Sequence, residues 1–281
     1  MRSRSTIFCA VLTLFDNAVR GAEQLMDIRD NRVCITGASS GIGEACARAF
    51  AAAGAHVCLV ARRIGRLEVL SSELASEHGV EVHCVSLDVR DRGRVESFAS
   101  ELPDSWKQLD ILVNNAGLSR GLDPIQRASV DDWDEMIDTN VKGLLYVTRS
   151  LVSAMVGRGK GHIINIGSIA GHEVYGGGSV YCATKHAVSA INRSMAIDLL
   201  GTGVRVSSVD PGMVETEFSL VRFHGDQQRA AGVYKGILPL MADDVADAVL
   251  YCATRPPHAN VREMVLMPSA QASVMHSHRT Q

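Results

Sequence analysis

The sequence predicts one α/β domain built on a Rossmann-like, doubly wound parallel sheet. From Arg32 onward, short β-branched segments alternate with helical segments, as in βαβ units. A glycine-rich turn, TGASSGIG (residues 36–43), follows the first such segment and opens a helix, the usual place of a dinucleotide-binding turn. No repeat, linker or change of composition divides residues 26–281 into two domains.

The expected elements alternate along this whole length. We expect strands at residues 32–35, 56–61, 81–86, 111–114, 162–166, 204–209 and 261–266. Helices are expected at residues 41–53, 65–78, 94–102, 130–156, 179–200 and 243–253. Because crossovers between parallel strands are right-handed, the helices should cover both faces of the sheet.

The least regular part comprises residues 212–238, which we call the cover segment. Ligands of such sheets bind at the carboxyl ends of the strands, so this segment is placed to cover a substrate. We expect the tail, residues 275–281, to be loose or used in assembly.

The composition excludes several classes of protein. Hydrophobic residues make up 46% and charged residues 21%, which excludes a disordered chain. The net charge of -3 provides no broad basic surface for nucleic acid. The 7 cysteines are scattered without metal-ligand spacing, so we expect reduced thiols, no metal site and a cytoplasmic protein.

Residues 1–25 form an extension whose status stays open. Two arginines precede an apolar run at residues 6–15, which is the outline of a secretory signal but is too short to cross a membrane. The free thiols argue against export. Since Met26 lies just before the first strand, the alternatives are a leader read from an upstream start codon, or a disordered or surface-packed extension.

The glycine turn is the first candidate for cofactor binding. Its spacing is GxxxGxG, and glycine allows the backbone to approach a pyrophosphate at the N-terminus of a helix. A glycine-rich turn without a ligand is the structural alternative. On the functional interpretation, the cofactor contacts Gly37, Ser39, Ser40, Gly41, Ile42 and Gly43.

The end of the second strand indicates which dinucleotide is bound. Arg62 and Arg63 stand where NAD sites carry an acidic residue, and arginine accommodates a 2′-phosphate, so the sequence favours NADP. The alternative is that both arginines are solvated loop charges. Asp88, after the third strand, is a candidate for the adenine ring or a cap of the next helix.

Three residues form the candidate catalytic group. Ser168 follows the fifth strand, and Tyr181 and Lys185 share one helix face at i and i+4. A nearby ammonium favours phenolate, which brings the pKa of Tyr181 closer to neutrality and suits it to general acid–base catalysis. Ser168 would hold the substrate oxygen in line.

Two asparagines have both structural and functional interpretations. Asn115 lies in the loop after the fourth strand, where an asparagine side chain often satisfies backbone groups. Asn140 lies inside a long predicted helix, where it is either an exposed polar residue or the site of a water and a local bend.

The chain resembles the short-chain dehydrogenase/reductase family over residues 30–270. The resemblance rests on TGASSGIG, LDV (87–89), NNAG (114–117), Asn140, Ser168, YCATK (181–185) and DPG (210–212). It implies that Tyr181 is the acid–base group, that Ser168 steadies the substrate oxygen and that Lys185 also binds the nicotinamide ribose. It further implies a water held by Asn140, and cofactor contacts from Val89, Asn115, Tyr181, Lys185, Pro211, Gly212, Val214 and Thr216.

Longer stretches resemble one branch of that family, the NADP-dependent 3-hydroxy acid dehydrogenases. They are residues 109–140, 161–171, 215–226 and 263–268. This resemblance implies oxidation of serine and related 3-hydroxy acids, reduction of malonic semialdehyde, and a homotetramer. Such a substrate needs a carboxylate clamp, for which Arg222 is the candidate; a surface pair with Asp226 is the alternative.

Two other functions remain open from the sequence. A ketoreductase for larger substrates, such as 3-oxoacyl thioesters, predicts an apolar cover segment, whereas residues 222–229 are mostly polar. A non-catalytic NADP-sensing protein predicts a broken catalytic set, whereas Ser168, Tyr181 and Lys185 are all present.

Overall fold

The predicted parallel sheet is present in the computed structural model, which describes residues 25–280. Its seven strands lie in the order β3-β2-β1-β4-β5-β6-β9, and every neighbouring pair is parallel. The strands are β1 (Arg32–Thr36), β2 (His56–Ala61), β3 (Val82–Ser86), β4 (Ile111–Asn114), β5 (Gly161–Ile166), β6 (Val204–Pro211) and β9 (Glu263–Leu266). The order reverses between β1 and β4, which is where doubly wound sheets bind ligands.

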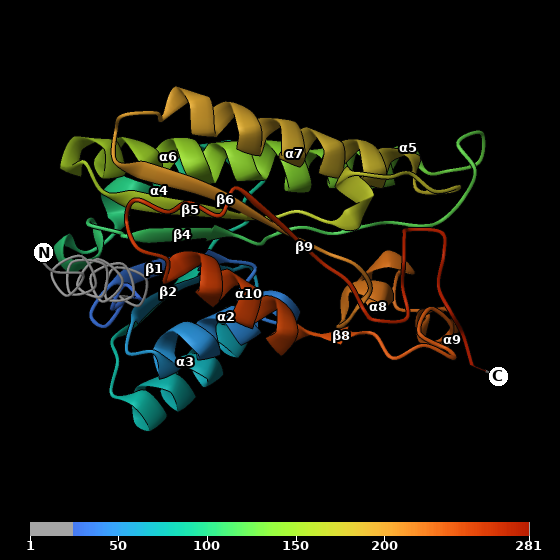
Figure 1. Ribbon diagram of the computed structural model, residues 1–281, viewed down its shortest axis with the longest axis horizontal. Coiled ribbons are helices and arrows are strands. Elements are labelled where there is room, and N and C mark those ends of the chain that lie inside the picture. Colours follow the sequence, from blue (N-terminus) through green and yellow to red (C-terminus); the bar gives the residue numbers. More distant parts are fainter. Residues whose placement is uncertain (1–24, 281) are drawn as a thin grey trace, which may run out of the picture.

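Helices cover both faces of this sheet (Figure 1). One face carries α2 (Gly41–Ala52), α3 (Ile64–His78) and α10 (Ala242–Ala253). The other face carries α4 (Arg92–Glu101), α6 (Leu144–Arg158) and α7 (Ser179–Asp198). Each layer buries its own apolar cluster, which includes Phe50 on the first face and Leu112 on the second. The central strands are buried on both sides because of these two layers.

The long helix expected at residues 130–156 is divided into three parts. It consists of α5 (Val130–Ile137), a wider π-helical turn at Asp138–Gly143, and α6. Asn140 lies within the π turn and is buried. The π turn agrees with the local bend that was one of the two alternatives for Asn140.

The cover segment is more regular than expected. It contains β7 (Val214–Glu215), α8 (Phe218–Arg222) and α9 (Gln227–Gly232), and β7 pairs with β8 (Leu240–Met241). Figure 1 shows these elements beyond the end of β6.

Residues 279 and 280 of the tail are hydrogen-bonded to the cover segment rather than loose. The Thr280 amide donates to the Gly236 carbonyl at 2.7 Å. The Arg279 guanidinium donates to the carbonyls of Lys235 at 2.6 Å and Val233 at 3.1 Å. The last described part of the chain therefore lies against the cover segment, beside α9 in Figure 1.

Residues 1–24, on which the interpretation of the N-terminal extension depends, lie outside the described part of the chain. Between residues 25 and 280, no helix combines the length and the apolar character needed to cross a bilayer.

Candidate active site

The glycine turn after β1 has the shape that an anion site requires. Gly37 adopts φ 68°, and a Cβ there would lie 2.8 Å from Nδ2 of Asn115. Asn115 donates this amide to the Thr36 carbonyl at 2.9 Å, so its side chain supports the turn, as the structural interpretation proposed. Ser40 begins α2 without a side-chain cap, so its hydroxyl does not occupy the first-turn amides.

Gly43 was expected to contact the cofactor, but it does not line the cavity. A Cβ at this position would lie 2.4 Å from both Nδ2 of Asn115 and the Gly37 carbonyl. The third glycine of the motif therefore allows α2 to pack closely behind the turn.

A polar cluster lies where the 2′-phosphate of NADP was expected. The Arg63 side chain donates to the hydroxyls of Ser40 at 2.7 Å and Ser39 at 3.1 Å, and to the Glu217 carboxylate at 2.9 Å. Arg66, one turn further along the chain, also donates to Glu217 at 2.7 Å. Hydrogen bonds from the two arginines hold the pKa of Glu217 below its usual value. Arg63 is therefore bound by neighbouring side chains, although its own side chain is 44% exposed.

Glu217 was not identified from the sequence. Three arginines within five positions, 62–66, were a signal for an acidic partner, but the sequence could not show which carboxylate reaches them. The partner comes from the cover segment, more than 150 residues later.

Asp88 lies in the cavity wall after β3. Its carboxylate accepts hydrogen bonds from Arg90, at 2.7 Å to one terminal nitrogen, and Arg62 approaches it at 4.0 Å. Burial alone would raise the pKa of Asp88, but the hydrogen bonds from Arg90 outweigh it and lower the pKa. The capping alternative is wrong, because Asp91 accepts from the Arg94 amide and caps α4.

Ser168 lies two residues beyond the end of β5 and has an extended backbone. Its hydroxyl accepts the Ala170 amide at 3.1 Å and lies 3.5 Å from the Pro211 carbonyl. The preceding residue must be glycine, because a Cβ at Gly167 would lie 1.8 Å from the Asp210 carboxylate. This close packing fixes Ser168 at the cavity wall.

Tyr181 and Lys185 project into the same cavity from α7. The Lys185 ammonium lies 6.0 Å from the centre of the Tyr181 ring and donates to the Ile166 carbonyl at 2.9 Å. Burial lowers the pKa of Lys185 to about 8, and the Asp210 carboxylate opposes this shift.

The electrostatic surroundings of Tyr181 differ from the expectation. Burial raises its pKa above the ordinary value of 10.0. The groups that oppose burial are the Arg222 guanidinium and the Ser168 hydroxyl, while Lys185 is not among them. The physical reason is that burial lowers the pKa of Lys185 to about 8, so this ammonium has lost its charge at the pH where the buried Tyr181 ionises.

Asn140 lies behind the cavity rather than in its wall. Its side chain accepts the Leu118 amide at 2.8 Å, donates to the Leu118 carbonyl at 2.8 Å and donates to Thr184 at 3.1 Å. It is 2% exposed, which excludes the surface alternative. Its neighbour Thr139 does line the cavity.

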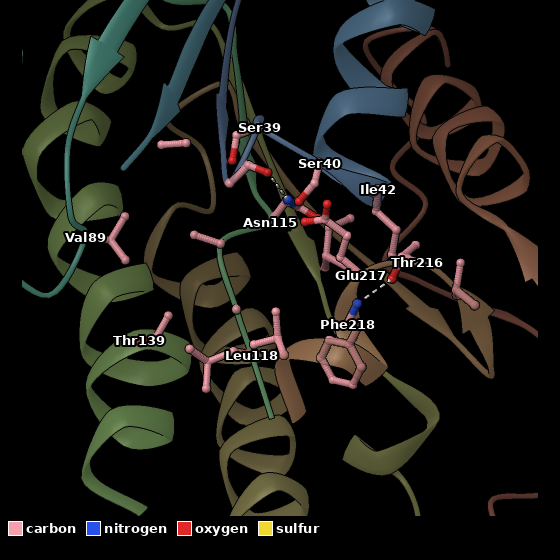
Figure 2. A pocket seen from close by; sticks show the side chains of 18 of the residues that line it. Ser39, Ser40, Ile42, Val89, Asn115, Leu118, Thr139, Thr216, Glu217 and Phe218 are labelled. Carbon is pink, nitrogen blue, oxygen red and sulfur yellow. Dashed lines mark hydrogen bonds between the residues drawn. The ribbon is translucent and has the colours of Figure 1, made fainter. Parts of the chain in front are cut away.

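The end of the cavity away from Ser39 and Ser40, which we call the substrate end, is lined by apolar side chains from two segments. Figure 2 shows Ser39 and Ser40 at one end of the cavity and Leu118 and Phe218 toward the other. The polar residues 224–229 of the cover segment are exposed and absent from the lining. Their polarity therefore does not exclude a larger apolar substrate, and that part of the sequence argument was wrong.

Arg222 is also absent from the lining. Its guanidinium packs over the rings of Tyr181, at 5.4 Å, and Phe218, at 5.1 Å, and donates to the Tyr175 hydroxyl at 3.1 Å. The alternative pairing with Asp226 is absent, because that carboxylate instead caps α9.

One cavity collects almost all of the other residues selected from the sequence. They are Gly37, Ser39, Ser40, Gly41, Ile42, Arg62, Arg63, Asp88, Val89, Asn115, Ser168, Tyr181, Lys185, Pro211, Gly212, Val214 and Thr216. Phe218 and Val221 were missed, although their i, i+3 spacing in the cover segment is that of one helix face.

Comparisons with known proteins agree with this geometry. The model of the family described as short chain dehydrogenase matches residues 31–225. An NADP-dependent 3-hydroxy acid dehydrogenase of Escherichia coli is 46% identical over 241 residues, which cover 85% of this chain and 96% of the relative. Sulfoacetaldehyde reductase 2 of Chromohalobacter salexigens is 46% identical over 241 residues, or 85% of this chain and 95% of the relative.

Solved structures give the same result. The closed form of a serine dehydrogenase complexed with NADP+ superposes with a TM-score of 0.83 and is 44% identical. The match covers 89% of this chain and 100% of that structure. A serine dehydrogenase from Escherichia coli gives a TM-score of 0.75 at 41% identity, covering 86% and 99% of the two chains.

Proposed function

The chain belongs to the short-chain dehydrogenase family, and from that premise we propose that it is an NADP-dependent oxidoreductase of small 3-hydroxy acids. It interconverts these acids and their oxo or semialdehyde forms, with serine and 3-hydroxypropionate as representative substrates. The observation that carries the proposal is the placement of Ser168, Tyr181 and Lys185 in one cavity wall. The same cavity extends to a cluster of arginine and serine side chains. The similar enzymes named above supply the substrate class.

The residues present fit NADP. The open glycine turn and the first turn of α2 suit a pyrophosphate, and Arg63 with Ser39 and Ser40 suits a 2′-phosphate. NADP, when bound, supplies or accepts the hydride. We assign Lys185 to the nicotinamide ribose, and the segment from Pro211 to Thr216 to the nicotinamide side of the cavity.

The proton chemistry falls to Tyr181. In reduction its hydroxyl donates a proton to the developing alkoxide, and in oxidation its phenolate accepts the proton of the substrate hydroxyl. Ser168 donates a hydrogen bond to the same oxygen and stabilises its charge. Asn140, bound to both backbone groups of Leu118, holds the π turn in place. We propose that this turn positions a water for proton exchange with Lys185.

The substrate carboxylate requires a cation, and Arg222 is our candidate. Its buried Nε has no hydrogen-bond partner among the described residues, so one donor is unused. Because Arg222 packs over the rings of Tyr181 and Phe218 and does not line the cavity, its side chain must turn toward the substrate to bind the carboxylate. A sulfonate carries the same single negative charge, which agrees with the similarity to a sulfoacetaldehyde reductase.

Initial rates with a matched substrate panel test this function. We expect turnover of serine and 3-hydroxypropionate with NADP, and reduction of malonic semialdehyde with NADPH. Absence of turnover on these substrates and on sulfoacetaldehyde would refute the substrate class. Preferential reduction of 3-oxoacyl thioesters would instead identify the ketoreductase, which the apolar lining by Leu118 and Phe218 keeps as the second candidate.

Replacement of the proton donor tests the mechanism. Tyr181→Phe should lower kcat by a factor of about 10² to 10⁴ and leave the Kd of NADP nearly unchanged, because only the hydroxyl is lost. Stopped-flow or steady-state rates with a fluorescence titration of NADP measure both quantities. A variant of normal rate would contradict the role of Tyr181.

We also propose that the chain works in the cytoplasm as a homotetramer. The free cysteines among the described residues are buried or half-buried, as expected of reduced thiols. Ile197 and Leu200, at the end of α7 and just beyond it, are 71% and 84% exposed, which favours their coverage by a second copy. Light scattering of the purified protein tests the tetramer.

A further inference from the structure

Helix α8 of the cover segment places a guanidinium against the proposed proton donor. The Arg222 guanidinium carbon lies 5.4 Å from the centre of the Tyr181 ring and 5.1 Å from that of Phe218. The two rings meet edge to face, with their centres 5.7 Å apart. Arg222 thus packs on the tyrosine itself, whereas the substrate end of the cavity is lined by Phe218 and Val221.

This position of Arg222 is fixed from several sides. Its side chain donates to the Tyr175 hydroxyl at 3.1 Å, and its carbonyl accepts the Gly121 amide at 2.9 Å. The preceding carbonyl, of Val221, accepts from the Arg120 guanidinium, which also donates to Glu135 at 2.7 Å. A loosely held surface arginine would not have these contacts.

The other groups around Tyr181 supply little positive charge. On α7 they are Lys185 and Cys182, after β5 there is Ser168, and before α7 there is Tyr175. Burial lowers the pKa of Lys185 to about 8, so its charge is lost as the pH rises through about 8, before Tyr181 ionises. A guanidinium remains charged throughout this range.

We propose that Arg222, anchored by Tyr175, is a positioning residue of the proton transfer that stabilises the phenolate form of Tyr181. This role is additional to any contact with a substrate carboxylate, and it rests on the proposed function only for the proton that Tyr181 moves. The effect is electrostatic: a cation over the ring favours the negatively charged form over the neutral phenol.

The tyrosinate absorbance of the cofactor-free protein tests the proposal without any substrate. Each protein is titrated in parallel with the same protein carrying Tyr181→Phe. The difference between the two absorbance curves is the ionisation of Tyr181 alone. In Arg222→Gln, we expect the midpoint of Tyr181 ionisation to move to higher pH by about one unit. At any pH below the midpoint, this shift means about tenfold less phenolate. Arg222→Lys should shift it less, because the charge is kept.

Two further variants make the result specific. Tyr175→Phe removes the anchor of Arg222 but keeps the ring, so the midpoint should move in the same direction by a smaller amount. Arg229→Gln is the matched control, since that guanidinium lies 4.4 Å from the Phe223 ring on the same segment and does not contact Tyr181; we expect no shift. An unchanged midpoint in Arg222→Gln overturns the proposal.

Kinetics separate this role from a simple carboxylate clamp. The pH profile of kcat/KM in oxidation is compared for 3-hydroxypropionate and its neutral methyl ester. A shift of the profile in Arg222→Gln with both substrates supports the proposal. If Arg222→Gln raises KM for 3-hydroxypropionate only and the pH profile of kcat/KM does not shift, the proposal is overturned. Arg222 would then act only as a carboxylate clamp. If wild type turns over neither compound, the proposed function fails, while the absorbance titration still decides the role of Arg222.

Discussion

The Arg63 guanidinium lies 2.9 Å from the Glu217 carboxylate, although 154 positions separate the two residues in the chain. Arg63 ends the loop after β2, where the cofactor phosphate is proposed to bind, and Glu217 precedes α8 of the cover segment. The contact therefore joins the cofactor end of the cavity to the segment that covers it.

Replacing Glu217 should strengthen the binding of NADP. Glu217→Gln removes a carboxylate that competes with the 2′-phosphate for Arg63, so we expect the Kd of NADP to fall by about two- to fivefold at low salt. The Kd of NAD should not change. Glu215→Gln, an exposed position of the same segment, is the control. Weaker NADP binding in Glu217→Gln would mean that the contact supports the cofactor.

The two arginines after β2 should differ in importance. Arg63 makes three side-chain contacts in the cluster, whereas Arg62 only approaches Asp88 at 4.0 Å. Arg63→Gln should therefore raise the Kd of NADP by about 10- to 100-fold, because a charged hydrogen bond to phosphate is lost. Arg62→Gln should weaken it less. Calorimetric titration with NADP and NAD measures this, and equal effects on both cofactors would argue against a phosphate site.

Gly43 should be required for folding stability rather than for cofactor contact. In Gly43→Ala the new Cβ would lie 2.4 Å from the Gly37 carbonyl, and we expect a loss of about 1–3 kcal/mol in the free energy of unfolding. Gly65→Ala, in the first turn of α3 with no atom near its added Cβ, is the control and should be neutral or stabilising. Urea unfolding measures both, and equal stabilities would contradict the packing role.

Lys185 should make the free energy of unfolding rise with pH in the alkaline range. Its pKa is about 8 in the folded chain and near 10.5 when unfolded. Between these values the unfolded chain holds a proton that the folded chain has lost, so the free energy of unfolding rises with pH. The full rise is about 3 kcal/mol, and it should be missing in Lys185→Met. Urea unfolding from pH 7 to 10 tests this, and parallel curves for the two proteins would contradict it.

Local patterns in the sequence were sufficient for most of the sheet and for the catalytic residues. The alternation of short β-branched runs with helical segments predicted the strands, because burial on both faces demands such runs. Motif spacing led to Ser168, Tyr181 and Lys185, because each follows a strand or shares a helix face. By contrast, the sequence left open whether Asn140 is an exposed residue or marks a local bend, and the buried π turn selects the bend.

The sequence by itself determined the fold, the family resemblance and the residues around the cofactor cavity. Only the tertiary structure decided which side chains meet: Glu217 with Arg63, and Arg222 with the Tyr181 ring rather than with the neighbouring Asp226. It also decided that Gly43 serves packing and that residues 224–229 face away from the cavity. The physical reason is that strands and turns follow local propensity and periodicity, whereas contacts between distant segments depend on how the whole chain packs.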